Sequence, residues 1–159
     1  DISVLAASVV LTDKQFDIEM TSSELALGQA VYFLGFPHGE QFNIPYGMNA
    51  GYPLPLVKGG LLSALPDFQS AERLLWLDGQ NNLGFSGGPV VFRPKGDSSL
   101  PFRIAGVVSA YPAYPEPVFT HSGDDTGNYV EANSGVVFAY CGSHACELIA
   151  QNPVGVIIE

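Results

Sequence analysis

Seven short apolar runs, separated by turn-forming residues, most strongly limit what this 159-residue chain can fold into. Each run is continuously apolar or alternates apolar and polar residues, and each is bounded by Gly, Pro, Asp or Asn, which is typical of β-strands. The 18 glycines and 12 prolines are spread along the chain and favour many short strands over long helices. The runs span residues 2–11, 29–35, 54–65, 73–77, 89–92, 102–110 and 134–140. We therefore expect an all-β domain.

Residues 143–151 (SHACELIAQ) break this strand pattern. Ser143 is a suitable N-cap, because its hydroxyl can accept a hydrogen bond from a backbone N–H of the first helical turn. Ala145, Leu148 and Ile149 follow with the i, i+3, i+4 spacing of one helix face. The sequence therefore predicts a β-barrel or sandwich that ends in one short helix.

Length and composition indicate a single packed domain. The chain is long enough for one sizeable core but not clearly for two. Its 47% hydrophobic and 14% charged residues favour a globular chain over disorder. Two long connections rich in Pro and Gly are expected at residues 36–53 and 111–128. Such loops often carry specificity when a rigid scaffold holds them.

Six Lys and Arg residues against sixteen Asp and Glu residues give a formal net charge of −10. Nucleic acids and anionic membranes both require a basic surface, so neither is expected as a partner. No apolar run approaches the ~20 residues of a membrane span, so membrane insertion is not expected. The chain opens on Asp1 without a basic segment, and we expect any targeting segment to be absent or already removed.

Cys141 and Cys146 lie five residues apart, and the sequence leaves both a local disulfide and two thiols open. His144 lies between them, but three ligands in one short stretch without a second cluster do not make a zinc site. No metal or cofactor is therefore expected. These two cysteines do not fix the redox compartment.

Residues 84–89 (GFSGGP) place one serine, Ser86, among three glycines and before a proline. A surface turn explains this composition, since Gly supplies positive φ and Ser satisfies the local backbone. A nucleophile explains it as well, because a substrate carbonyl could then approach both the Oγ and bare backbone N–H groups. The six residues alone leave both explanations open.

The same residues fit G-x-S-x-G, the nucleophile elbow of α/β-hydrolases. Asp124 or Asp125 and then His144 follow Ser86 in the order that such a triad requires. The elbow needs a helix directly after the serine, however, and residues 89–92 (PVVF) are strand-like. No alternation of strands and helices occurs elsewhere in the chain, so the elbow is disfavoured.

Five segments, in order, resemble the trypsin-like serine proteases, most closely their bacterial Deg-type branch. They are DISVLAA, LGQAVYFLGFPHG, LDGQNNLGFSGGPVVF, FRIAGVVSAY and SGVVFAY followed by a helix. In the third, Asp78 precedes Ser86 by eight residues, as in the family pattern. The resemblance implies a six-stranded Greek-key β-barrel, the second of a two-barrel protease. Residues 1–24 would then be the end of the first barrel and the inter-barrel linker, and residues 25–159 the second barrel with a terminal helix at about 142–151.

The resemblance also implies a serine endopeptidase that acts through an acyl-enzyme. Ser86 would be the nucleophile, and the backbone N–H groups of Gly84 and Ser86 would form the oxyanion hole. Asp1 would be the triad aspartate that orients the catalytic base. Deg-type relatives are often exported, which slightly favours a periplasmic or extracellular location.

The implied substrate is an extended peptide or protein segment that adds as a strand to the end of one barrel strand. Its backbone partners would be Ser109, Ala110 and Tyr111. Gln80 would lie at the base of the side-chain pocket, with Gly135 on its wall and Tyr111 at its mouth. Because Gln80 is neutral and Tyr111 is bulky, we expect a preference for small or medium apolar side chains over Lys or Arg.

In this family the histidine that activates the nucleophile precedes the aspartate, and here Asp1 is the first residue. His38, His121 and His144 do not occupy positions that the family uses for catalysis. We therefore expect the sequence to be the C-terminal portion of a longer protease, inactive alone because Ser86 lacks a general base.

Two further expectations concern partners. The surface that would face the absent barrel should be apolar, and it should bind either the missing N-terminal barrel or a second copy of the chain. Alternatively, the domain is a non-catalytic, protease-like fold that binds peptides or proteins, which fold alone does not exclude.

Overall fold

The computed structural model describes residues 3–5, 18–40, 42, 49–65, 67, 69, 73–96 and 100–151. This part of the chain contains eight β-strands, two short 3-10 helices and one α-helix. The strands are β1 (Ala30–Gly35), β2 (Leu56–Ala64), β3 (Leu74–Asp78), β4 (Pro89–Phe92), β5 (Arg103–Ala110), β6 (Ala113–Phe119), β7 (Asp125–Asn133) and β8 (Val136–Cys141). The helices are η1 (Pro37–Gly39), η2 (Asn49–Gly51) and α1 (Ser143–Gln151).

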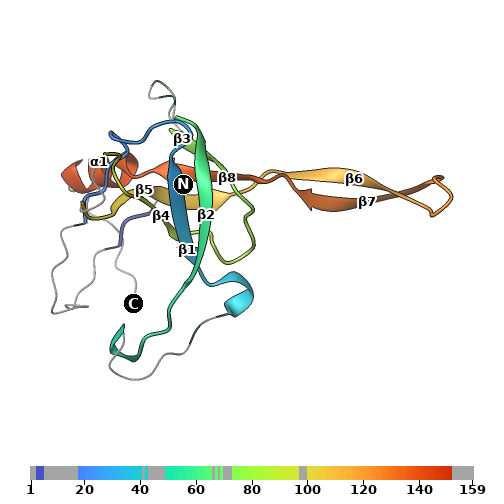
Figure 1. Ribbon diagram of the computed structural model, residues 1–159, viewed down its shortest axis with the longest axis horizontal. Helices are drawn as coiled ribbons and strands as arrows, with labels where there is room; N and C mark the ends of the chain where they lie inside the picture. Colours follow the sequence, from blue (N-terminus) through green and yellow to red (C-terminus); the bar gives the residue numbers. More distant parts are fainter. Residues whose placement is uncertain are drawn as a thin grey trace.

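Six of the strands close into one barrel in the order β1-β2-β3-β8-β5-β4 (Figure 1). Every neighbouring pair is antiparallel, and β4 closes the ring by pairing with β1 through Tyr32↔Val91 and Phe33↔Val90. The closed barrel with one C-terminal helix confirms the prediction of an all-β barrel. This architecture is compatible with a chymotrypsin-like fold.

Alternate residues of the barrel strands fill its interior. In β1, Val31 and Phe33 are fully buried, while Tyr32 between them is 40% exposed. This is the period-2 pattern of a strand with one buried face, and each fully buried side chain of this size contributes about 1.5–3 kcal/mol. The largest core side chains are Phe33, Phe85, Phe92, Leu62, Leu75 and Leu77. Phe85 comes from the loop before β4, so this loop is itself part of the core.

The predicted runs match the observed strands closely. Six of the seven runs lie within two residues of β1, β2, β3, β4, β5 and β8 at both ends, and the predicted helix at 143–151 coincides with α1. Of the run at 2–11, only residues 3–5 are described, and they are not in a strand. The rest of that run and Asp1 lie outside the described residues.

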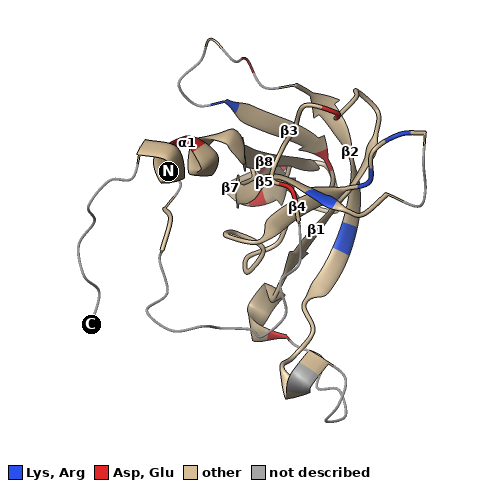
Figure 2. Ribbon diagram, turned by 90° about the vertical axis from the view of Figure 1, so that its left-hand side faces the viewer, with Lys and Arg blue, Asp and Glu red and all other residues tan. Residues whose placement is uncertain are grey.

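The C-terminal helix α1 starts two residues after β8 ends and lies beside the barrel, as Figure 2 shows from another side. Ala145 is buried. Arg73, just before β3, forms an ion pair with Glu147 and a 3.3 Å hydrogen bond with Ser143 Oγ. These contacts attach the helix to the barrel. No helix in the described part of the chain has both the length and the apolar character needed to cross a membrane.

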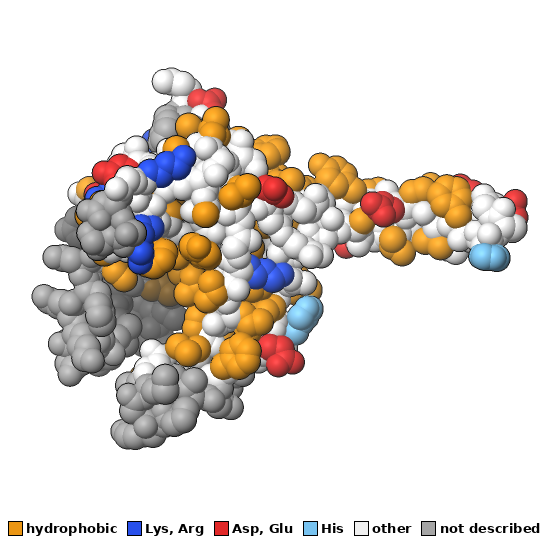
Figure 3. All heavy atoms as spheres, in the orientation of Figure 1, with side chains coloured by type: hydrophobic (Ala, Val, Ile, Leu, Met, Phe, Trp, Pro, Cys, Tyr) orange, Lys and Arg blue, Asp and Glu red, His pale blue; other side chains and the backbone are white. Residues whose placement is uncertain are grey.

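Residues 111–128 are not the irregular connection that their Pro and Gly content predicts. Instead, β6 and β7 form a two-stranded antiparallel sheet that projects away from the barrel (Figures 1 and 3). The prediction was wrong because proline usually ends a strand, whereas Pro115 and Pro117 of β6 lie at a sheet edge. The hairpin leaves the barrel between β5 and β8.

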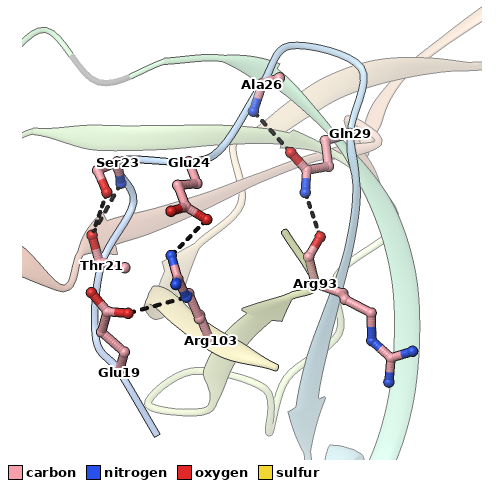
Figure 4. Close-up of polar contacts among 8 residues, drawn as sticks. All are labelled: Glu19, Thr21, Ser23, Glu24, Ala26, Gln29, Arg93 and Arg103. Atoms are coloured by element: carbon pink, nitrogen blue, oxygen red, sulfur yellow. Dashed lines mark hydrogen bonds and ion pairs between the residues drawn. The ribbon is translucent and has the colours of Figure 1, made fainter. Parts of the chain in front are cut away.

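Residues 18–24 run beside the first half of β5. The backbone N–H of Ile104 donates to Glu19 O at 2.9 Å. Arg103 pairs with Glu19 at 3.1 Å and with Glu24 at 2.6 Å, which Figure 4 shows in detail. The segment that precedes the barrel is therefore attached to β5 by both backbone and side-chain contacts.

Candidate functional site

Ser86 lies in an exposed turn between β3 and β4. Strand β4 begins at Pro89, so a barrel strand and not a helix follows the serine. This excludes the nucleophile elbow, which requires a helix there. The other residues of that alternative are also far apart. Asp124 and Asp125 lie at the tip of the projecting hairpin, whereas His144 is in α1 on the opposite side of the barrel (Figure 1).

Two glycines allow the turn to pack directly against the end of β1. Gly84 has a φ of +102°, and a Cβ at this position would lie 2.4 Å from the carbonyl oxygen of Phe36. A Cβ at Gly88 would lie 1.8 Å from the carbonyl oxygen of Leu34. A side chain at either position would push the turn away from β1, and at Gly84 it would also occupy a conformation that favours glycine.

Phe85 anchors the turn in the barrel core. Its side chain is fully buried and packs edge-to-face on Phe33, with the ring centroids 5.3 Å apart. Lys58 Nζ lies 5.3 Å from the centroid of the Phe85 ring, within the range of a cation–π interaction. Because Phe85 points inward, the neighbouring Ser86 is left at the surface. Sequence analysis missed this anchor, whose signal is a large apolar residue inside a Gly-rich motif.

The turn is hydrogen bonded to the C-terminal half of β5. Ser86 Oγ donates to the carbonyl oxygen of Ser109 at 2.9 Å. Gly87 N–H donates to Val108 O at 2.8 Å, and Val108 N–H donates to Gly88 O at 2.9 Å. The structure therefore brings the predicted nucleophile beside the strand end that carries the predicted substrate-binding residues.

Two backbone N–H groups of the turn, those of Gly84 and Ser86, have no acceptor among the described residues. The N–H of Phe85 between them differs, because it donates to Asn82 O at 3.4 Å. The two unengaged N–H groups are available to an oxygen atom of a bound ligand, as an oxyanion hole requires. Their role in such a hole stays a prediction.

Hydrogen bonds to carbonyl oxygens fix the directions of these two N–H groups. The N–H of Gly84 shares its peptide plane with Leu83 O, which accepts a bond from His38 N–H at 3.2 Å. The N–H of the serine shares its plane with Phe85 O, which accepts a bond from Gly88 N–H at 2.9 Å. In a trans peptide the N–H and C=O groups point in opposite directions. Each hydrogen bond to a carbonyl oxygen therefore fixes the direction of the N–H group on the opposite side of the same peptide plane.

Contacts from β2 and from the segment before β8 hold the loop that carries Gln80. Lys58 Nζ donates to Gln80 O at 2.9 Å, and Gly79 N–H donates to Gly135 O at 2.8 Å. The residues predicted for the base and wall of a pocket, Gln80 and Gly135, thus lie on hydrogen-bonded segments. Tyr111 directly follows β5 and is half-buried. Sequence analysis missed Lys58, because no local pattern places its side chain at a loop 22 residues away.

Ser86 has no histidine partner among the described residues, because the one hydrogen bond of its Oγ goes to Ser109 O. His38 is exposed in η1 and is joined to the turn through its backbone. His121 lies in the exposed turn between β6 and β7, and His144 lies in α1. Asp1, the predicted orienting residue, lies outside the described residues.

Other candidate groups lie away from Ser86. Cys141 is buried and Cys146 is exposed, and both are free thiols, which decides the alternative that the sequence left open. Within the described ranges, no three His, Cys, Asp or Glu side chains gather closely enough to hold a metal ion. A surface hollow at the start of β5 is lined by Ile18, Glu19, Pro101, Phe102 and Arg103. Ser86 contacts the other end of that strand.

Comparison of the sequence with models of known protein families finds no matching family, and comparison with curated proteins finds no significant match. The geometry around Ser86 is therefore the observation that bears most directly on function.

Proposed function

We propose that this chain carries the nucleophile-bearing barrel of a trypsin-like serine endopeptidase, with Ser86 as the nucleophile. The observation that supports this most is an exposed serine hydroxyl flanked by two N–H groups that have no acceptor among the described residues. An ordinary surface turn does not require a buried anchor such as Phe85. It also does not require hydrogen bonds that fix the peptide planes of both N–H groups. The Deg-type resemblance of five sequence segments agrees with this proposal.

In the proposed reaction, Ser86 Oγ attacks the carbonyl carbon of a peptide bond, and the carbonyl oxygen becomes an oxyanion. The N–H groups of Gly84 and Ser86 stabilise this charge, and loss of one such donor typically lowers the rate about 10²–10³-fold. Collapse of the tetrahedral intermediate expels the amine and leaves an acyl-enzyme, which water then hydrolyses. The serine proton must pass to a base, and we propose that Asp1 orients that base.

No described residue is placed to act as this base. Ser86 Oγ donates to the backbone carbonyl oxygen of Ser109, which is too weakly basic to remove a hydroxyl proton. We therefore expect the 159-residue chain on its own to hydrolyse peptides very slowly or not at all.

The proposed substrate is an extended peptide that pairs with the backbone of Ser109, Ala110 and Tyr111. Its side chain would point toward Gln80, which is neutral. Lys58 Nζ, 2.9 Å from Gln80 O, places a positive charge beside the backbone of this residue. A cationic side chain would be repelled there, so we expect small or medium apolar side chains to be preferred over Lys and Arg.

A fluorophosphonate probe tests the nucleophile, because it reacts covalently with activated serines. The chain alone should label slowly, and added imidazole, which supplies an external base, should accelerate labelling of Ser86. Mass spectrometry locates the adduct, with Ser86→Ala as the negative control and the exposed Ser122 of the hairpin as an internal reference. Labelling of Ser86 no faster than that of Ser122, even with imidazole, would contradict the proposal. Rapid labelling without imidazole would overturn the expected inactivity of the chain alone.

A non-catalytic function is supported by one observation, namely that the Ser86 hydroxyl is bound to Ser109 O rather than to a base. In this alternative, the end of β5 binds extended peptides without cleaving them. Equal peptide binding by the wild-type chain and by Ser86→Ala, together with unlabelled Ser86, would select this alternative.

Apolar side chains border the turn. Leu83 is 68% exposed and Phe36 is 42% exposed. Backbone hydrogen bonds join the segment that contains Phe36 to the turn that contains Leu83. We propose that this border contacts a missing N-terminal barrel or a second copy of the chain. Sedimentation velocity tests the second copy: self-association weakened by Leu83→Ser would support it, and a monomer at every concentration would contradict it.

A further inference from the structure

The β6–β7 hairpin projects from the barrel as a separate arm (Figures 1 and 3). It forms its own two-stranded sheet, and no other strand of the described ranges pairs with it. From Ala113 to Val130 every residue is exposed except Val118, which is half-buried. The arm therefore adds nothing to the barrel core, and its role must be sought in what it presents to solvent.

Large apolar side chains are exposed along this arm. Tyr114, Phe119, Tyr129 and Val130 are between 51% and 65% exposed, and the arm carries several orange patches in Figure 3. Two-stranded hairpins are marginally stable by themselves. Exposed aromatic residues on such an element point to a binding surface rather than to a stabilising one.

The two outer edges of the hairpin differ in hydrogen-bonding capacity. In the observed register Pro115 pairs with Glu131, and Pro117 pairs with Tyr129. Proline has no N–H, so these are non-hydrogen-bonded pairs, in which the backbone groups point away from the partner strand. The outer edge of β6 therefore lacks two donors, whereas Tyr129 and Glu131 direct complete N–H and C=O groups outward. Strand addition is blocked at β6 and open at β7.

A polar network at the tip holds the two strands in this register. Thr120 N–H donates to Asp124 O at 2.8 Å, and Gly123 N–H donates to Thr120 O at 3.0 Å. Ser122 Oγ donates to Asp124 Oδ2 at 2.7 Å. The open edge of β7 is thus ordered before any ligand binds, which reduces the entropy lost on binding.

The charge of the arm indicates the chemistry of its partner. Residues 111–133 contain no Lys or Arg and four carboxylates, those of Glu116, Asp124, Asp125 and Glu131. A second copy would bring another acidic hairpin from a chain whose net charge is also −10, so self-pairing is disfavoured. A strand that carries Lys or Arg would instead gain favourable cross-strand charge pairs.

We propose that the outer edge of β7 binds an extended, basic segment of a partner protein by β-strand addition. The outward backbone groups of Tyr129 and Glu131 supply the hydrogen bonds. The two side chains lie on the same face of the strand, two residues apart, and select an apolar and a basic side chain at alternate positions of the partner. This surface is separate from the proposed peptidase site, and binding there requires no chemistry at Ser86.

The probe is a fluorescein-labelled peptide, TVTKTVTKT, which has the same length as the nine residues of β7. It is titrated with the full chain and followed by fluorescence anisotropy. Saturable binding is expected, with lower affinity at higher salt. The same peptide with glutamate in place of lysine should not bind. N-methylation at one set of alternate residues should abolish binding, and methylation at the other set should preserve it, because only alternate N–H groups of an added strand face its neighbour.

Four variants locate the site on the chain. Tyr129→Pro removes an outward N–H without removing a bond within the hairpin, and it should weaken binding about tenfold or more. Glu131→Gln should weaken binding about threefold, whereas Glu116→Gln, a matched charge change on the other face, should have little effect. A variant in which Asn-Gly replaces residues 115–131 should not bind, yet should retain the imidazole-assisted labelling of Ser86.

Three results would overturn the proposal: no binding by the wild-type chain, undiminished binding by the shortened hairpin, or equal effects of the two methylation patterns. The methylated peptides act on the wild-type chain, so the proposal stays testable even if Tyr129→Pro disturbs the hairpin. Failure of peptide binding with intact labelling of Ser86 would reject this proposal alone, and the converse result would reject only the proposed peptidase site.

Discussion

The barrel and the β6–β7 hairpin use strands of similar length in different ways. Strands β2 and β7 both contain nine residues. The barrel strands direct alternate side chains into a shared core, where Phe33, Leu75 and Leu77 are fully buried. Strands β6 and β7 contain no buried residue. The barrel is therefore held together by its core, whereas the hairpin depends on cross-strand pairs and on its tip.

This difference separates stability from recognition within one small protein. The proposed nucleophile belongs to the barrel, because Phe85 beside it is a core residue. Substitutions at its turn should therefore change folding and reactivity together. Substitutions on the hairpin should change binding while leaving folding nearly intact. Three experiments test this contrast.

The largest expected loss of stability is that of the Phe85→Ala variant. Removal of this fully buried ring should lower the free energy of unfolding by about 3–5 kcal/mol, because a cavity remains in the core. The matched hairpin change, Tyr129→Ala, removes a ring that is 65% exposed and should cost about 0.5 kcal/mol or less. Urea unfolding followed by circular dichroism measures both. Equal losses would show that the hairpin ring is packed, which contradicts the comparison.

Within the turn that carries Ser86, Gly84→Ala should lower the free energy of unfolding more than Gly87→Ala. Both positions have positive φ, +102° and +84°, but a Cβ at Gly84 would also lie 2.4 Å from Phe36 O, whereas nothing lies within 4 Å at Gly87. We expect a loss of about 1–2 kcal/mol for Gly87→Ala from the backbone alone and a larger loss for Gly84→Ala. Thermal unfolding and imidazole-assisted labelling of Ser86 measure the two effects. The reverse order would contradict the packing of the turn against β1.

The smallest expected loss of stability is that of the variant with the most residues removed, in which Asn-Gly replaces residues 115–131 of the hairpin. Tyr114 and Ala132 are opposite each other in the register and, next to the non-hydrogen-bonded Pro115–Glu131 pair, form a hydrogen-bonded pair, which a two-residue turn can close. The side-chain bond from Asn133 to Asn81 O is kept. No core residue is lost, and the free energy of unfolding should change by less than about 1 kcal/mol. Loss of cooperative unfolding in this variant would show that the arm supports the barrel.

The barrel strands could be predicted from the sequence because one face of each is buried. Burial imposes a period of two, and turn residues mark the ends, so six runs and the helix at 143–151 were placed correctly. The hairpin could not be predicted in this way. Its side chains are exposed on both faces, and Pro115 and Pro117 normally argue against a strand.

The candidate site was also only partly predictable. The GFSGGP motif identified Ser86 as a candidate, and the family resemblance implied that Ser109 lies near it, as the hydrogen bond between them bears out. The inward direction of Phe85 depends on the packing of the whole barrel. The contact of Lys58 with Gln80 O joins segments that are distant in sequence. Asp1 lies outside the described residues, and its role stays a prediction.

The bond from His38 N–H to Leu83 O connects η1 to the proposed oxyanion hole. If η1 shifts, Leu83 O loses its hydrogen-bond donor. The peptide group between Leu83 and Gly84 can then rotate, which would turn the Gly84 N–H away from the proposed oxyanion hole. In the proposed peptidase, a shift of η1 would then abolish activity without any contact to Ser86, while the buried Phe85 side chain would hold the rest of the turn in place. Hydrogen exchange at the His38 amide measures how often this bond opens. Rapid exchange in a protein whose Ser86 still labels at the full imidazole-assisted rate would rule out this control by η1.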